Sequence, residues 1–345
     1  MVNNHLYIFG AGSSKDFGFP LGNEFFEKAH ILSASPQEKT KSIRHIERNL
    51  KAVEKILRSI FHNLPDEHEH WPNFEELFSL LHALKSKGEL NITENDIKKF
   101  VALIFHTLSA CHFMFLDVNG IKKFSYYKDF ISNILKNAKE NPSFINLNYD
   151  YLLDAAIEEV VNDNSLNAIP QNYKIDLYNV SNCEKITQGR YILIKPHGSL
   201  KIAKCNKCEI FFYVRDTFVP RIDNKRTPCP KCNESITYSH LIPPTYFKNV
   251  PTLIDAHEII KLVSNAHKIT IIGYSFPPYD IEMKYLIFRG LFKNKKDVLF
   301  KIIDFDEDND VEKVRNKYKF LQLFTRKKML FNTEGFLMYL KHVNS

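Results

Sequence analysis

The feature that most constrains the fold lies at the start of the chain. The apolar, β-prone run at residues 6–9 stops at a glycine-rich turn, Gly10 to Ser14. A strand that leads into such a turn and then a helix is typical of nucleotide-binding α/β units, because glycine lets the backbone approach a pyrophosphate. The third glycine of the usual fingerprint is missing, so a tight turn with a purely structural role is an equal alternative.

Four further segments have the pattern of short buried strands, and amphipathic helical segments lie between them. These strands are expected at residues 143–147, 191–194, 269–272 and 298–303. Strands that alternate with helices predict an α/β fold with a mainly parallel, Rossmann-like sheet.

The region before residue 140 differs from this pattern. Residues 43–61, 74–84 and 97–108 have apolar residues at helical spacing and few strand signals between them, which indicates a helical insertion. The expected organisation is a discontinuous Rossmann-like nucleotide-binding domain, a helical insertion and a small module with four cysteines, which we call the ribbon. Their expected bounds are 1–34, 140–200 and 241–345 for the first, 35–139 for the second and 201–240 for the third.

Glycine or polar residues follow the end of each predicted strand. Asn148 follows the second strand, His197 the third, Gly273-Tyr274-Ser275 the fourth and Asp304 the fifth. The carboxyl ends of parallel strands together form the ligand crevice of an open α/β sheet, so these residues are expected to meet at one site. Two glycine turns in one sheet favour a dinucleotide over a mononucleotide.

Asn148 and His197 are the candidate reactive pair. Asn148-Tyr149-Asp150 precedes a helical segment, so simple capping by Asn or Asp is an equal alternative. A histidine in a Pro-His-Gly-Ser turn is, on its own, more often structural. Their shared place at the crevice favours function, because histidine can act as a general base near neutral pH and an Asn amide can hold water or a ribose hydroxyl.

Two CxxC pairs predict a metal site. Cys205, Cys208, Cys229 and Cys232 have 20 residues between the pairs, a spacing that favours one tetrahedral, structural zinc ion. Four protein ligands leave no open position, so catalysis by this zinc is not expected. Residues 201–232 carry eight Lys or Arg against three Asp or Glu, which favours a solvated surface over direct contact with nucleic acid.

Length, net charge and hydropathy limit the number of domains and the location of the protein. A chain of 345 residues can form two or three cores, and a net charge of +7 is a mild excess that does not by itself indicate a nucleic-acid partner. No apolar run approaches the roughly 20 residues that cross a bilayer, and residues 1–10 do not resemble a signal peptide. A cytoplasmic location without membrane contact is therefore expected.

The ordered motifs resemble the sirtuin superfamily over the α/β core and the ribbon, but not over the helical insertion. The resemblance implies a sirtuin/DHS-like fold and NAD as the substrate, because sirtuins cleave the bond between nicotinamide and ribose. Asn148 would orient the ribose and a water, Asp150 would recognise the carboxamide, and His197 would act as general base. Ser13, Gly12 and Ser275 would hold the phosphates, and Asp304 the adenosine ribose. The full set of implied cofactor contacts is Gly10, Ala11, Gly12, Ser13, Ser14, Pro20, Tyr149, Gly273, Tyr274, Ser275 and Asp304.

Three departures from the deacylating sirtuins bear on the reaction. Residues 21–23 replace the usual Asp-Phe-Arg, residues 241–247 lack the Phe-Gly-Glu that borders the acyl-lysine groove, and Tyr149 replaces Ile. These features resemble the sirtuin-like proteins of bacterial anti-phage systems, which hydrolyse NAD to nicotinamide and ADP-ribose. That resemblance implies a triggered NAD glycohydrolase. It also implies a homo-oligomer, or a partner defence protein such as an ATPase, bound through the helical insertion.

Two alternatives remain at this point. A protein deacylase or ADP-ribosyltransferase would use the same NAD site but would need an acyl-lysine peptide or a protein acceptor. A non-catalytic module that senses NAD or ADP-ribose, with nucleic-acid contact through the basic ribbon, would bind without turnover. The presence of both Asn148 and His197 argues against this second alternative.

Overall fold

A computed structural model gives the structure of the protein. The residues that it describes are 3–34, 41–115, 118–161, 168–180, 182–205, 207–214, 228–234, 236–237, 240–242 and 256–343.

A seven-stranded sheet crosses the described part of the chain in the order β13-β12-β11-β1-β2-β5-β3, and its paired strands run parallel. The strands are β1 (Asn3–Phe9), β2 (Glu140–Asn146), β3 (Ala168–Asn172), β5 (Thr187–Ile194), β11 (Lys268–Ile272), β12 (Leu299–Ile303) and β13 (Leu330–Asn332). The predicted α/β class with a mainly parallel sheet is confirmed. The edge strands β3 and β13 are additional to the five that the sequence predicts.

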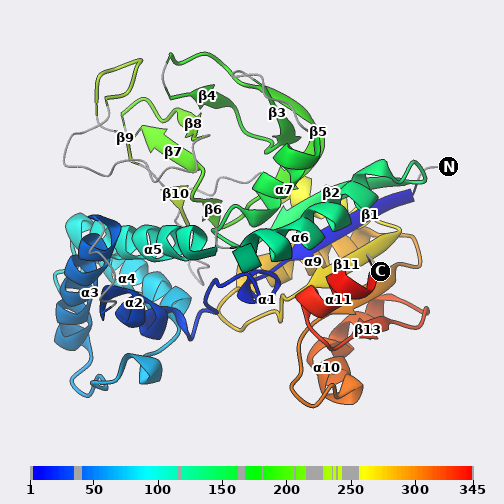
Figure 1. The fold of residues 1–345 in the computed structure, drawn as a ribbon, viewed down its shortest axis with the longest axis horizontal. Coiled ribbons are helices and arrows are strands. Elements are labelled where there is room, and N and C mark those ends of the chain that lie inside the picture. Colours follow the sequence, from blue (N-terminus) through cyan, green and yellow to red (C-terminus); the bar gives the residue numbers. More distant parts are fainter. Residues whose placement is uncertain are drawn as a thin grey trace.

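Helices cover both faces of this sheet (Figure 1). On β1, Tyr7 and Phe9 belong to a core shared with α6 (Val118–Lys136), α7 (Leu152–Val161) and α11 (Phe336–Val343). Leu6 and Ile8 belong to a second core with α8 (Ala256–Asn265), α9 (Ile281–Lys293) and α10 (Val311–Tyr318). Successive strand residues point to opposite faces, so a strand covered on both sides is apolar throughout.

The sheet has a switch point between β1 and β11. From β1 the chain continues to β2 and β5 on one side, whereas β11, β12 and β13 follow one another on the other side. At such a point the loops after the two central strands diverge and leave a crevice at the carboxyl ends. The short helix α1 (Gly12–Lys15) begins there, directly after β1.

A helical region lies beside the sheet, at the left of Figure 1. Its helices are α2 (Phe25–Ala34), α3 (Lys41–Ile60), α4 (Phe74–Lys87) and α5 (Glu94–Phe115), with the single turn η1 (His68–His70). The helices predicted at 43–61, 74–84 and 97–108 correspond to α3, α4 and α5. Helix α4 has matching end signals, because the Asn73 side chain accepts from the Glu75 N–H and Gly88 ends the helix at φ 69°.

A small four-stranded sheet, β4-β8-β7-β9, holds the four cysteines and has its own core. Its strands are β4 (Leu177–Asn179), β7 (Ile202–Cys205), β8 (Phe211–Tyr213) and β9 (Ile236–Thr237). The short pair β6 (Gly198–Ser199) and β10 (His240–Leu241) lies between this sheet and the central one (Figure 1). The proposed division into three domains remains a prediction. None of the described helices combines the length and the apolar character that crossing a membrane requires.

Candidate functional site

Two glycine turns lie against each other where β1 and β11 end. The Gly12 N–H donates to the carbonyl oxygen of Gly273 at 3.0 Å. A Cβ atom on Gly12 would lie 2.8 Å from Cα of Gly273, and one on Gly273 would lie 2.3 Å from the nitrogen of Ser13. Gly273 also has a φ of +61°, which strains any residue with a side chain. The contact between the turns therefore requires glycine, whichever ligand the crevice takes.

Most polar groups of the first turn form hydrogen bonds within the turn. The N–H groups of Ser13 and Ser14 donate to the carbonyl oxygens of Gly10 and Ala11 at 2.9 and 3.0 Å. The buried Ser13 hydroxyl donates to the carbonyl oxygen of Gly10 at 2.8 Å. Phosphate binding by Gly12 and Ser13 remains a prediction, and both have structural hydrogen bonds already. Ala11, by contrast, is exposed on the wall of the crevice.

Asn148 joins the end of β2 to this turn. Its Nδ2 donates to the carbonyl oxygen of Gly10 at 3.0 Å and lies 3.1 and 3.0 Å from the hydroxyl oxygens of Ser13 and Ser14. The Gly10 carbonyl can only accept, so this geometry assigns the amide NH₂ to the turn and leaves Oδ1 as the acceptor. Asn148 does not cap α7; that helix begins at Leu152, whose N–H donates to Asp150 Oδ1 at 3.0 Å.

Asp150 is buried and is held from three sides. Its Oδ2 accepts from the Ser14 hydroxyl at 2.8 Å, and its main-chain oxygen accepts from Nζ of Lys195. Lys195 also forms a buried ion pair with Asp154 at 3.1 Å. Burial raises the pKa of Asp150, and the nearby Lys195 charge opposes that rise. This network fixes the Asn148–Asp150 turn against β5.

His197, after β5, pairs with a carboxylate that sequence reasoning missed. Its Nε2 lies 3.2 Å from Oδ2 of Asp280, which also accepts from the Tyr274 hydroxyl at 2.8 Å. Burial by itself lowers the pKa of His197, but the charges of Asp280 and Glu75 outweigh it, so the pKa is raised. The imidazole is therefore oriented by Asp280 and holds a proton more readily than a free histidine does.

Asp280 and Glu75 escaped sequence analysis because both stand at helix starts, where acidic residues are ordinary. Asp280 is the N-cap residue of α9, yet its side chain makes no capping hydrogen bond. Glu75 lies in the first turn of α4 and is partly buried. Burial raises the pKa of Glu75, and the charge of His197 partly opposes that rise. Only the fold shows that both carboxylates face the crevice.

The crevice consists of two adjoining pockets, with about 720 and 1160 Å³ of space between atoms, part of it open to solvent. We call them the histidine pocket and the Asp304 pocket. Predicted residues on the wall of the histidine pocket are Gly10, Ala11, Ser14, Pro20, Asn148, Tyr149, Asp150, His197, Gly273, Tyr274 and Ser275. Those on the wall of the Asp304 pocket are Ala11, Gly12, Gly273, Ser275 and Asp304. Ser13 lines neither, and Ala11, Gly273 and Ser275 line both.

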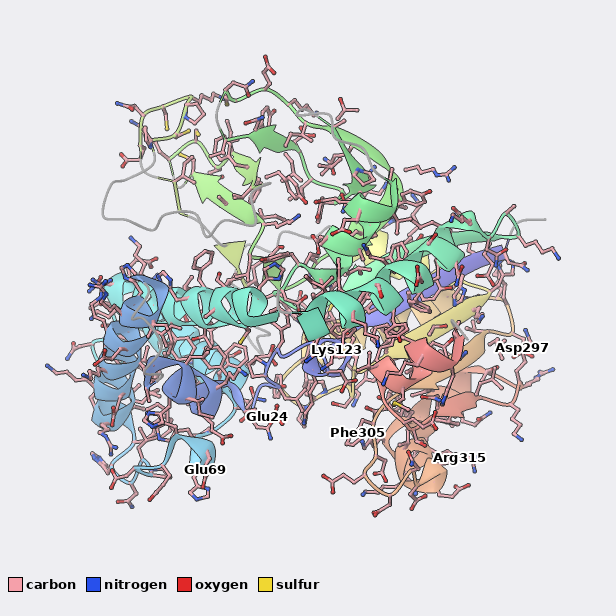
Figure 2. All side chains as sticks on the ribbon, viewed as in Figure 1. Glu24, Glu69, Lys123, Asp297, Phe305 and Arg315 are labelled. Carbon is pink, nitrogen blue, oxygen red and sulfur yellow. The ribbon has the colours of Figure 1, made fainter. Side chains whose placement is uncertain are left out.

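The Asp304 pocket carries charges of both signs. Asp304 Oδ2 lies 3.3 Å from Nζ of Lys317 and accepts from the Tyr318 hydroxyl at 3.1 Å. The exposed Phe305 borders this pocket and is labelled in Figure 2. Lys123 of α6 is labelled in the same view, and its Nζ donates to the Asp16 carbonyl oxygen at 2.9 Å.

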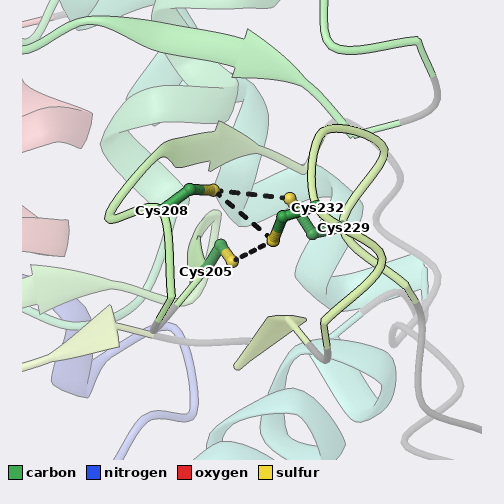
Figure 3. Close-up of side chains that lie close together, drawn as sticks. All are labelled: Cys205, Cys208, Cys229 and Cys232. Atoms are coloured by element: carbon green, nitrogen blue, oxygen red, sulfur yellow. Dashed lines mark hydrogen bonds between the residues drawn. The ribbon is translucent and has the colours of Figure 1, made fainter.

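The four predicted metal ligands form one cluster, shown in Figure 3. The Sγ separations are 3.5 Å for Cys205–Cys232, 3.6 Å for Cys208–Cys229 and 3.9 Å for Cys208–Cys232. Zn–S bonds of about 2.3 Å in a tetrahedron place the sulfur atoms roughly 3.8 Å apart. The cluster therefore fits a structural zinc ion, with no position left for substrate. It is the one metal-binding group of His, Cys, Asp or Glu found within the described residues.

Comparison with protein-family models and with curated proteins finds no match to this sequence. Among solved structures, the chain is similar to Sir2Tm bound to a propionylated peptide, with 15% identity, 99% of this chain and 91% of that chain covered, and a TM-score of 0.38. It is similar to a Sir2 complex with a p53 peptide and NAD+, with 15% identity, coverage of 99% and 91%, and a TM-score of 0.37. It is also similar to a mutant Sir2 homologue with ADP-ribose, with 13% identity, coverage of 93% and 94%, and a TM-score of 0.37. The expected resemblance to sirtuins thus recurs among solved structures.

Proposed function

We propose that this protein hydrolyses the nicotinamide–ribose bond of NAD+ and releases nicotinamide and ADP-ribose. The observation that carries the proposal is the meeting of Asn148 and His197 in one pocket that continues, past the two glycine turns, into a second pocket with Asp304. A dinucleotide has two ends joined by a pyrophosphate and suits two joined pockets at a switch point. The reactive bond would lie in the histidine pocket and the adenosine in the Asp304 pocket.

The pocket residues suit the chemistry of this bond. When the C1′–N1 bond breaks, its electron pair leaves with nicotinamide and positive charge develops on the sugar. Water then adds to C1′ and gives up a proton, which neutral His197 accepts at the ring nitrogen that faces the water. Asn148 Oδ1 would accept a hydrogen bond from that water or from a ribose hydroxyl. The zinc ion, when bound, holds the ribbon together through four thiolates.

Two further points belong to the proposal. Unregulated loss of NAD harms the host cell, so we propose that a trigger controls the activity, as in an effector of bacterial anti-phage defence. The helical region would bind the partner protein or a second copy of the chain. Support comes from the crevice, whose wall includes Phe74, Glu75 and Leu108 of α4 and α5. Residues 243–247, on which part of the contrast with deacylases rests, lie outside the described residues.

The test is product analysis by mass spectrometry, with purified protein and in cells that express it with its genetic neighbours. We expect nicotinamide and ADP-ribose without any acylated peptide. Asn148→Ala and His197→Ala should each lower the rate by about 10²-fold or more. Asn141→Ala is the matched control, because Asn141 lies at the other, exposed end of β2.

Three outcomes would contradict the proposal. Full activity in both pocket variants would reject the assigned roles. O-acyl-ADP-ribose, or product formation only with a peptide or protein acceptor, would favour a deacylase or a transferase. Binding of NAD without turnover would favour a sensor, whose contact with nucleic acid should weaken steeply with salt.

A further inference from the structure

The two pockets of the crevice differ in charge. The wall of the histidine pocket holds three carboxylates, Glu75, Asp150 and Asp280, and the imidazole of His197, but no Lys or Arg among the described residues. The wall of the Asp304 pocket includes Lys15 and Lys317 together with Asp16 and Asp304. Asp150 has Lys195 nearby, behind the wall, whereas no lysine or arginine of the described residues lies on the wall beside Glu75 and Asp280.

Asp280 has an unused acceptor in this pocket. The residue is 2% exposed, and its Oδ2 is engaged by His197 and Tyr274. Its Oδ1 is buried and has no hydrogen-bond partner among the described residues. An N-cap aspartate normally stabilises its own helix, but this side chain turns to the pocket instead. A buried carboxylate oxygen without a donor favours a positively charged neighbour.

Glu75 brings a second carboxylate from the helical region. Its N–H is bound by Asn73, so its position at the start of α4 is fixed. Its side chain hydrogen-bonds to Tyr279 and interacts with the charges of His197 and Asp280. Glu75 and Asp280 lie with His197 on the wall of the histidine pocket, where the sugar and the water would react.

We propose that Glu75 and Asp280 form a carboxylate subsite that binds the positive charge of an N-substituted pyridinium and stabilises the sugar cation that forms as its bond breaks. This inference rests on the proposed function and assigns it two further residues. Neither carboxylate forms a bond to the sugar. The electron pair leaves with nicotinamide, water supplies the new oxygen, and its proton goes to His197. The two negative charges act electrostatically, and they act most strongly when the charge has moved to the sugar.

Binding of two small probes tests the subsite without any turnover. 1-Methylnicotinamide carries a positive ring nitrogen, whereas nicotinamide is neutral and has almost the same shape. We expect the full-length, zinc-loaded protein to bind the cation at least about tenfold more tightly in calorimetry. Glu75→Gln keeps the shape of the side chain and should lose most of this preference. Glu76→Gln should retain it, because Glu76 is the exposed neighbour on α4.

Kinetics then separates the subsite from the proposed reaction. Glu75→Gln should lower kcat for nicotinamide release by about 10²-fold with a smaller change in KM, and Asp280→Asn should act in the same direction. Unchanged probe preference and unchanged kcat in Glu75→Gln would overturn the subsite but leave NAD hydrolysis standing. A preference for the cation that depends on Glu75, in a protein that never releases nicotinamide, would support the subsite and reject the hydrolase.

Discussion

Replacing Lys195 by Met tests how the protein holds the Asn148–Asp150 turn. Lys195 and Asp154 have side chains 1% and 0% exposed, with Nζ and Oδ2 3.1 Å apart. Removing the ammonium group leaves the Asp154 carboxylate buried, with the Tyr173 hydroxyl as a remaining donor. Loss of one partner of a buried pair costs about 3–5 kcal/mol, because a charge without compensation stays in the interior.

An exposed pair supplies the control. Lys185 and Asp176 are closer together, at 2.7 Å, but their side chains are 58% and 64% exposed. Such pairs contribute about 0–1 kcal/mol, since water screens both charges. If distance alone decided the contribution to stability, the exposed pair would stabilise the protein more. If burial decides it, the Lys195–Asp154 pair does.

The assay is denaturant unfolding of Lys195→Met and Lys185→Met beside the unchanged protein. We expect the first variant to lose about 3–5 kcal/mol and the second less than about 1 kcal/mol. Lys195→Met with Asp154→Leu should recover part of the loss, because no buried charge is then left alone. If Lys195→Met lowered the free energy of unfolding by no more than Lys185→Met does, burial would not determine how much the Lys195–Asp154 pair stabilises the protein.

Two further predictions concern the metal and the pH dependence. Cys208→Ser should abolish bound zinc, measured by atomic emission, and lower the melting temperature, whereas Cys183→Ser should keep about one zinc ion per chain because Cys183 lies beside the cluster but not in it. For pH, a raised pKa of His197 means that the imidazole is protonated, and inactive as a base, over more of the acidic range. Hydrolysis should therefore fall as pH falls through that pKa. Asp280→Asn removes the charge that raises the pKa, so the acidic limb of the rate profile should move to lower pH; an unmoved limb would reject His197 as the titrating base.

The strands that the sequence predicted are those with buried residues on both faces. Such strands are continuous apolar runs with sharp ends, as in β1 and β11, and their assignment needs no tertiary information. The two strands of the central sheet that the sequence did not predict, β3 and β13, lie at its edges. β3 contains Pro170 and polar residues, and β13 has three residues, so neither carries a pattern distinct from a loop. Their partners in the sheet, not their own sequence, make them strands.

Some residues of the candidate site could likewise be predicted from the sequence, and others could not. Asn148 and His197 could be found because Asn148 directly follows a predicted strand and His197 comes three residues after the end of another, and topology brings such ends together. The glycine turns were ambiguous in sequence, and the structure shows a packing reason for Gly12 and Gly273 that holds with or without a ligand. Glu75 gave no signal, because an acid in the first turn of a helix is expected anyway.

The position of Glu75 links the helical region to the reaction centre. Asn148 and His197 are held in the turns after β2 and β5 of the central sheet. Glu75 is held by α4, which packs against the other helices. The helix also meets the site at its start, where Phe74 lies against Tyr149 and the cap residue Asn73 donates to the Tyr279 hydroxyl. In the proposed hydrolase, a partner or second copy that shifts α4 would therefore move the Glu75 charge relative to the reacting bond. The electrostatic energy between two charges falls as they separate and is largest where water is excluded, so in the proposed hydrolase a displacement of α4 would act on the rate through Glu75.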